Sequence, residues 1–277
     1  MKGFGNKEIK KRLSTRELVR ETLIKKALKA YQEGDTNYAI NCFENCVNKG
    51  LHDAKLLSQY GIILFKSGFR LKAINILEQA IITYPKDPDS YTNLSNIYKL
   101  IGDLRKAEVY IKKSYELRPN STIVLNNLSS ILISNKQFRE AEKYVFLSQK
   151  LDPSNFEPFY NLGIIYSNIH HYQEAIIYFK EAIKKDKNSY EANLNLGAVL
   201  LKLNRFNEAK DFLKVALFLN PSSFETYFNL GQIALYTRKF EESEDYLNKS
   251  LNLCKNNYEI YKYLGIVQFM NSNYDLS

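Results

Sequence analysis

Cysteine and histidine are the residue types in this 277-residue sequence best suited to metal binding or catalysis. Cys42, Cys46 and His52 lie close together, but a tetrahedral metal site needs a fourth ligand that is absent from this group. Cys46 also falls where small residues recur along the chain, so we expect a packed thiol there. His170 and His171 have no nucleophile or carboxylate constellation around them, so we expect exposed turn residues.

Glycine-rich phosphate-binding loops are also absent from the sequence. The nearest approach, Gly3-Phe4-Gly5, has no strand before it and no third glycine after it. We therefore predict no catalytic, cofactor-binding or metal-binding residues, no cofactor, and a protein that is not an enzyme.

The positive charge of the chain is concentrated at its N-terminal end. Of the net charge of +9, residues 1–30 contribute +7, whereas the rest holds 29 basic and 27 acidic residues. This balance disfavours a nucleic-acid partner for the body of the chain, which would need a basic stripe. The basic segment 1–19 is either a solvated cap over the first hairpin or a tether to an acidic partner, nucleic acid or a membrane.

Neither a transmembrane segment nor a secretory signal is predicted, because no apolar run is long enough for either. Three cysteines in a chain of this length do not make a disulfide framework. The simplest interpretation is a reducing, cytoplasmic location.

One period of 34 residues organises the sequence. Small residues recur at this spacing: Ala39, Ala73, Ala107, Ala141, Ala175 and Ala209. A second series follows the same spacing at another phase: Tyr60, Leu94, Leu128, Leu162, Leu196, Leu230 and Leu264. The period predicts seven full repeats and a partial one within residues 20–277, at 20–53, 54–87, 88–121, 122–155, 156–189, 190–223, 224–257 and 258–277.

Each repeat has the pattern of two short helices joined by a turn. In residues 156–189, Phe159, Leu162 and Tyr166 follow helical spacing in the first half, and Ala175 and Phe179 do so in the second. Glycines fall at the turn between the helices in the first three repeats: Gly34, Gly68 and Gly102. One such hairpin cannot bury its apolar faces alone, so neighbouring hairpins are expected to stack.

This pattern resembles the tetratricopeptide repeat family. The order aromatic or Leu, Leu-Gly, aromatic, Ala, aromatic, Ala, Pro is that family's signature, and residues 156–223 carry it most clearly. The resemblance implies an all-α fold: a right-handed α-α superhelical solenoid of 34-residue helix-turn-helix repeats. Departures include Lys26 where Leu is usual, and Ser95 and Ser129 where Gly is usual.

The two ends of the repeat region have features of their own. Ser14-Thr15-Arg16-Glu17 matches a capping box, which predicts a first helix from Thr15 to Glu33. The last helix, residues 258–271, is apolar on nearly every side. Such a surface is expected either to be covered by a further part of a longer chain or to pair with another subunit, which makes a homo-oligomer possible.

The family resemblance implies where a ligand would bind. First helices line a concave groove in this family, and one position of each repeat points into it. Asparagine occupies that position in five successive repeats: Asn93, Asn127, Asn161, Asn195 and Asn229. A carboxamide both donates and accepts hydrogen bonds, so the row could hold a peptide backbone, as a similar row does in O-GlcNAc transferases. Tyr160 and Phe228 are the expected apolar anchors, and the alternative is that these asparagines are solvated and the rings only pack.

Two functions remain open at this stage. The first is a non-enzymatic scaffold that binds a protein or peptide of unknown identity in the groove. The alternative is the substrate-docking arm of a larger transferase whose catalytic domain lies beyond residue 277.

Overall fold

The computed structural model describes the backbone of residues 15–274 and the side chains of residues 17–271. The described backbone contains fifteen α-helices and no strand, which confirms the predicted all-α fold. The helices are α1 Thr15–Gln32, α2 Thr36–Asn48, α3 Ala54–Lys66, α4 Arg70–Thr83, α5 Pro88–Leu100, α6 Leu104–Leu117, α7 Thr122–Ser134, α8 Phe138–Leu151, α9 Glu157–Asn168, α10 Tyr172–Lys185, α11 Tyr190–Lys202, α12 Phe206–Leu219, α13 Phe224–Tyr236, α14 Phe240–Leu253 and α15 Tyr258–Tyr274.

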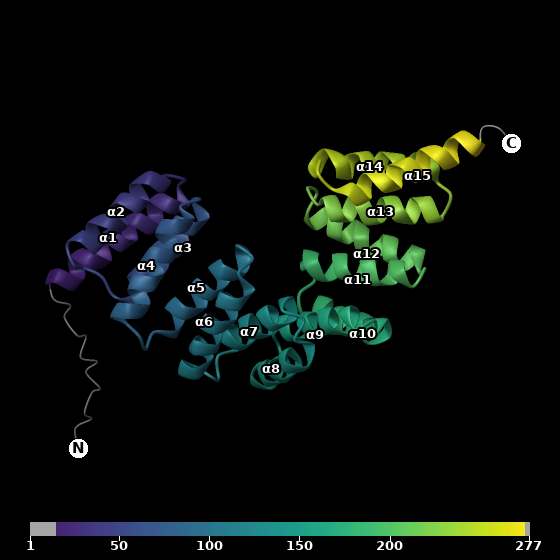
Figure 1. Cartoon of the computed structure of the whole chain (residues 1–277). Coiled ribbons are helices and arrows are strands. Elements are labelled where there is room, and N and C mark those ends of the chain that lie inside the picture. Colours follow the sequence, from purple (N-terminus) through teal and green to yellow (C-terminus); the bar gives the residue numbers. More distant parts are fainter. Residues whose placement is uncertain (1–14, 275–277) are drawn as a thin grey trace, which may run out of the picture. The chain divides into compact units, whose positions relative to one another are not determined.

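The helices form antiparallel hairpins in two compact units, an N-terminal body, Met1–Ile131, and a C-terminal body, Leu132–Ser277. We call the odd-numbered helices A helices and the even-numbered ones B helices. In the N-terminal body α1–α2, α3–α4 and α5–α6 pair as hairpins, and in the C-terminal body α9–α10, α11–α12 and α13–α14 do so (Figure 1). Within each body, successive hairpins contact one another, as the stacking argument requires.

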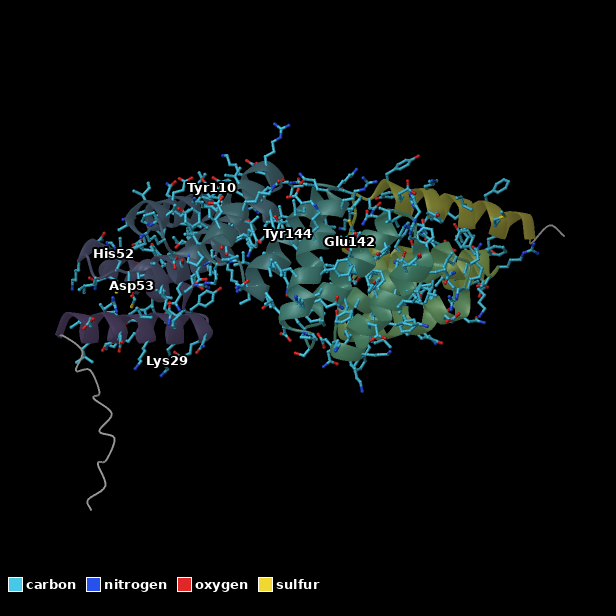
Figure 2. All side chains as sticks on the ribbon, turned by 90° about the horizontal axis from the view of Figure 1, so that it is seen from below. Lys29, His52, Asp53, Tyr110, Glu142 and Tyr144 are labelled. Atoms are coloured by element: carbon cyan, nitrogen blue, oxygen red, sulfur yellow. The ribbon has the colours of Figure 1, made fainter. Side chains whose placement is uncertain are left out.

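The helix starts follow from local capping chemistry. Asp53, labelled in Figure 2, accepts a hydrogen bond from the Leu56 N–H at 2.8 Å and so begins α3. The same Asp53 pairs with Arg20 of α1 at 3.0 Å, which ties the first two hairpins together. At the N-terminus, the predicted first helix does begin at Thr15 and ends one residue early, at Gln32. The predicted capping box begins at Ser14, which lies outside the described residues.

The turn between the A and B helices needs a left-handed residue in every repeat. Gly34, Gly68 and Gly102 each have φ of +88°, as the sequence predicted. The same turn recurs at 34-residue spacing without glycine, with φ between 57° and 64°, at Lys136, His170, Asn204 and Arg238. The residue after each left-handed position closes the turn with a backbone hydrogen bond of 2.8–2.9 Å to the end of the A helix, for example His171 N–H to the Tyr166 carbonyl. Four turns therefore accept backbone strain that three turns avoid.

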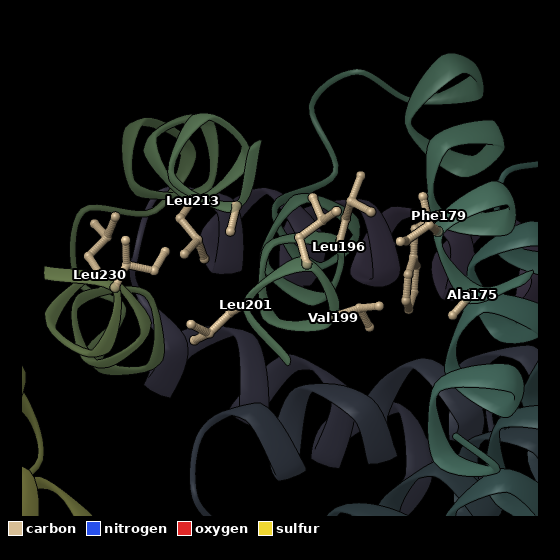
Figure 3. Packing of buried hydrophobic residues seen from close by; sticks show 11 residues of the cluster. Ala175, Phe179, Leu196, Val199, Leu201, Leu213 and Leu230 are labelled. Atoms are coloured by element: carbon tan, nitrogen blue, oxygen red, sulfur yellow. The ribbon is translucent and has the colours of Figure 1, made fainter. Parts of the chain in front are cut away.

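The core of each hairpin is a large B-helix side chain seated on a small A-helix residue. In the C-terminal body the buried cluster runs from Ala175 and Phe179 through Leu196 and Leu213 to Leu230 (Figure 3). A Cβ atom built on Gly163 would lie 2.6 Å from the Phe179 ring, and one on Gly197 would lie 2.6 Å from Leu213. Glycine at these two points leaves the space that the Phe179 ring and the Leu213 side chain occupy.

Two serines that depart from the family pattern fit this seam by hydrogen bonding across it. Ser95 stands in the place of the seam glycine of α5 and donates to the Ala107 carbonyl of α6 at 2.8 Å. Ser243, in the place of a seam alanine of α14, donates to the Gly231 carbonyl of α13 at 2.8 Å. Both side chains are fully buried, so these bonds offset the cost of placing a hydroxyl in the core.

We predict that substitutions at the left-handed turn change stability in opposite directions. Gly102→Ala forces a Cβ into φ +88° and should lower the free energy of unfolding by about 1 kcal/mol. Lys136→Gly relieves the same strain at an exposed site and should raise the urea midpoint slightly. If both variants shifted the urea midpoint by the same amount in the same direction, this account would be contradicted.

We predict a matched contrast at the seam. Gly→Ala inside a helix normally gains about 1 kcal/mol from helix propensity. Gly265→Ala should show this gain, because, its chain neighbours and the adjacent backbone of its own helix aside, no described atom lies within 4 Å of its Cβ position. Gly163→Ala should instead destabilise the protein, since its Cβ would collide with Phe179. Thermal unfolding followed by circular dichroism distinguishes the two, and a gain at both positions would show that the seam is not tight.

Candidate functional site

The surface that the sequence assigns to ligand binding is carried by the A helices. In the C-terminal body α9 contacts α11, α11 contacts α13, and α13 contacts α15, so these four helices form one row. We call the surface of this row that carries Asn161, Asn195, Asn229 and Tyr263 the A-helix face. Asn93 and Asn127 occupy the same repeat position on α5 and α7, in the N-terminal body.

The asparagines of the row are not equivalent in the structure. Asn161 is almost fully buried, with 6% of its surface exposed, and it interacts within the protein. Asn93, Asn127, Asn195 and Asn229 are half-buried. Asn127 donates to the Ile123 carbonyl one turn earlier at 3.0 Å, which uses one of its two N–H groups. Asn229 makes no side-chain hydrogen bond to another described residue, so its carboxamide is the least engaged of the three in the C-terminal body.

Tyr160 and Asn195 connect two successive A helices. The Asn195 amide donates to the Tyr160 hydroxyl at 3.2 Å and to the Glu191 carbonyl at 2.8 Å. Both amide hydrogens are therefore used, and the Oδ1 acceptor is what Asn195 can offer a ligand. Burial, with the nearby Glu191 charge, raises the pKa of Tyr160 to about 12, so this hydroxyl stays protonated at neutral pH. The Tyr160 ring lies 6.0 Å from that of Phe179, which makes it a core residue with a polar tip.

Phe228 belongs to an aromatic group at the α13–α15 end of the A-helix face. Its ring meets Tyr263 edge to face, with centroids 5.3 Å apart, and both pack on the last buried cluster. The Tyr263 hydroxyl lies 3.3 Å from the hydroxyl of Tyr236. A pocket of about 520 Å³ opens beside this group. It is lined by Leu235, Tyr236, Arg238, Phe240, Lys262, Tyr263, Ile266 and Met270.

Lys99 is a cation on α5, an A helix of the N-terminal body. Its ammonium donates to the Ser130 hydroxyl at 2.6 Å, and burial lowers the pKa of Lys99. No carboxylate lies within ion-pair distance of Lys99 among the described residues. Lys99 stands on the same helix as Asn93, but no repeated pattern in the sequence marks it.

Cys42 and Cys46 lie one turn apart on α2, but His52 does not join them as a metal-binding group. Cys46 is fully buried, and burial raises the pKa of its thiol, which disfavours the reactive thiolate. His52 lies against Tyr84 instead, with Nδ1 3.3 Å from the hydroxyl. His170 and His171 are exposed in the α9–α10 turn. Among the described residues no three His, Cys, Asp or Glu side chains are grouped so as to hold a metal ion.

A membrane-spanning helix would need both length and an apolar composition. Within the described residues no helix combines the two.

The pocket beside Tyr263 is the feature of this surface that sequence reasoning missed. Tyr263 was visible in the sequence as the residue that follows five asparagines in the row. The enclosing residues come from a turn and two helices, and their spacing carries no signal of a cavity. Arg238 could have been found as the residue that replaces glycine at the left-handed turn position.

We predict that the asparagines differ in their contribution to stability. Asn161→Ala removes a buried, bonded carboxamide and should cost about 1–3 kcal/mol. Asn229→Ala should change the free energy of unfolding by less than about 0.5 kcal/mol, as a half-buried side chain without a described partner. Urea unfolding measures both variants, and equal losses would refute the distinction.

Family models and solved structures both support the repeat architecture. Family models described as tetratricopeptide repeat match residues 76–109, 170–232 and 224–257. Among curated proteins, no sequence matches this one.

Solved structures match the fold over most of the chain. A tetratricopeptide repeat protein from Parabacteroides merdae ATCC 43184 has a TM-score of 0.75 at 16% identity, over 91% of this chain and 99% of that one. The APC/C hetero-tetramer Cut9–Hcn1 gives a TM-score of 0.77 at 16% identity, over 87% of this chain and 48% of that one. PilF of Pseudomonas aeruginosa gives 0.60 at 16% identity, over 91% and 99%. At these identities the likeness is one of fold.

Proposed function

Because this chain is a tetratricopeptide repeat protein, we propose that it is a non-enzymatic scaffold that binds a polypeptide segment along its A helices. The observation that carries the proposal is the row of half-buried carboxamides at one repeat position, flanked by aromatic rings. Asn195 and Asn229 stand on adjacent A helices of the C-terminal body, and Asn93 and Asn127 hold the same position in the N-terminal body.

The hydrogen-bonding state of these amides defines how they would hold a peptide. Asn195 has both amide hydrogens engaged, so it accepts from a peptide N–H through Oδ1. Asn229 is free to both donate and accept, and can pair with the N–H and C=O of one peptide unit. Asn161 is too deeply buried to contribute much, and in this proposal it positions the row. Contacts of this kind bind the peptide backbone and do not distinguish one peptide side chain from another. Selectivity for particular side chains therefore has to come from other residues of the surface.

In this proposal Tyr160 and Phe228 do not act as the apolar anchors that the sequence predicts. Each ring packs on the buried clusters, and only an edge or a polar tip remains for a ligand. Tyr160 therefore acts mainly by orienting Asn195, and Phe228 by supporting Tyr263.

One structural neighbour fits a role in assembly. The Cut9–Hcn1 structure is a hetero-tetramer, and one of its chains shares this fold at a TM-score of 0.77 over 48% of its length. A scaffold that binds another protein is consistent with that use of the fold. Four points stay predictions: the docking-arm alternative, a homo-oligomer through residues 258–271, a repeat region that begins at residue 20, and a cytoplasmic location.

The proposal is tested by selecting peptides that bind the 277-residue protein from a displayed random library. Affinities of the selected peptides are then measured by fluorescence anisotropy for the wild type and for Asn195→Ala/Asn229→Ala. We expect the double variant to bind about tenfold or more weakly, because three neutral hydrogen bonds of about 0.5–1.5 kcal/mol each are lost. Asn248→Ala, an exposed asparagine on the B helix α14, is the matched control and should bind as the wild type does.

Two results would count against the proposal. One is a library that yields no binding peptide. The other is an unchanged affinity in the double variant while its helical circular dichroism signal is intact.

A further inference from the structure

The pocket beside Tyr263 combines an apolar interior with cations at its edge. Leu235, Ile266 and Met270 give it aliphatic walls, and Tyr236, Phe240 and Tyr263 give it aromatic ones. Its volume of about 520 Å³ lies within the range of about 300–1,000 Å³ that is usual for ligand sites. Ile266, Met270 and Tyr236 are 36%, 44% and 50% exposed, which leaves apolar surface for a partner to cover.

The walls of the pocket are held in place by contacts outside it. Tyr236 stacks on Phe206 with ring centroids 5.8 Å apart, and Tyr263 is braced by Phe228 at 5.3 Å. The two tyrosine hydroxyls lie 3.3 Å apart at one edge. A site whose rings are already ordered loses little conformational entropy when a side chain enters it.

Two basic residues border the pocket, and they differ in whether they form an ion pair. Arg238 is exposed at the left-handed turn position, and no described carboxylate forms an ion pair with it. Lys262 pairs with Glu259 at 3.4 Å on an exposed helix surface, where such a pair is weak and readily exchanged. Glu241 and Glu242 line a neighbouring hollow with Arg238, and Glu242 is paired with Lys210 at 2.6 Å.

The pocket also continues the row of asparagines. Tyr263 holds on α15 the repeat position that Asn195 and Asn229 hold on α11 and α13, and α13 contacts α15. A peptide backbone bound along Asn195 and Asn229 would therefore reach the pocket with its next residues.

We propose that this pocket takes a large apolar side chain of the bound polypeptide, with an aspartate or glutamate next to it in the sequence paired to Arg238 and Lys262. The inference rests on the proposed function and supplies the selectivity that the asparagine row lacks. The partner is thus an internal acidic-apolar segment of another protein. Apolar burial provides the affinity, and the carboxylate fixes the direction of the chain through charge-assisted hydrogen bonds.

The test repeats the peptide selection with a library whose peptides are joined at both ends to the display protein, so that no free C-terminal carboxylate exists. We expect the wild type to enrich Phe, Leu or Met beside Asp or Glu. Arg238→Glu should keep the apolar preference and lose the acidic one, and should weaken a selected acidic peptide about tenfold, as expected for one charge-assisted contact. Met270→Trp, which fills the pocket from an exposed position, should lose the apolar preference.

The matched control is Lys136→Glu, which makes the same charge change at the same left-handed repeat position, away from this pocket. It should leave the selected sequences and their affinities unchanged. Circular dichroism of each variant reports whether the helices are intact.

The outcomes separate the two proposals. If peptides are selected and depend on Asn195 and Asn229 but show no acidic-apolar preference, or keep it in Arg238→Glu, the pocket inference is wrong and the scaffold proposal stands. A synthetic peptide that binds only with a free C-terminal carboxylate would also overturn the internal-segment proposal. If no peptide is selected, both fall.

Discussion

The fold depends on one contact that is repeated along the chain: a large apolar side chain of a B helix resting on a small residue, glycine or serine in most hairpins, of its A helix. Gly163 under Phe179 and Gly197 under Leu213 are two instances, each with room for hydrogen only. This contact brings the two helices of a hairpin together and buries the aliphatic and aromatic residues around it. Because the next hairpin presents the same surfaces, the stack extends without any new interaction.

The same contact decides which residues are left for binding. Side chains of the A helix that face the B helix or the preceding hairpin are buried in the core, as Leu196 and Leu230 are. The remaining side of each A helix carries half-buried polar groups, such as Asn195 and Asn229, held by a rigid scaffold. The turn contributes in a similar way, since its left-handed residue is exposed, and two such residues, Lys136 and Arg238, each line a pocket.

The neighbours in known structures show that this architecture tolerates wide divergence in sequence. At 16% identity, what the chains share is the stacking of helical hairpins. The residues that we propose for ligand binding lie on the surface that this stacking leaves open, where substitution does not disturb the seam. Arg238, Lys262 and Tyr263 are such residues in the proposed pocket.

The sequence by itself determined the repeat, the helical hairpins, the glycine turns and the seam, because each is set by residues at fixed local spacing. It also placed five asparagines at one repeat position. The tertiary structure alone decided that Asn161 is buried while Asn229 is not, that the Asn195 donors are already used, and that four turns adopt the left-handed conformation without glycine. The pocket beside Tyr263 likewise appeared only there. Exposure and hydrogen bonding depend on side chains from neighbouring helices, and a period in one chain does not encode how those side chains fill the space between them.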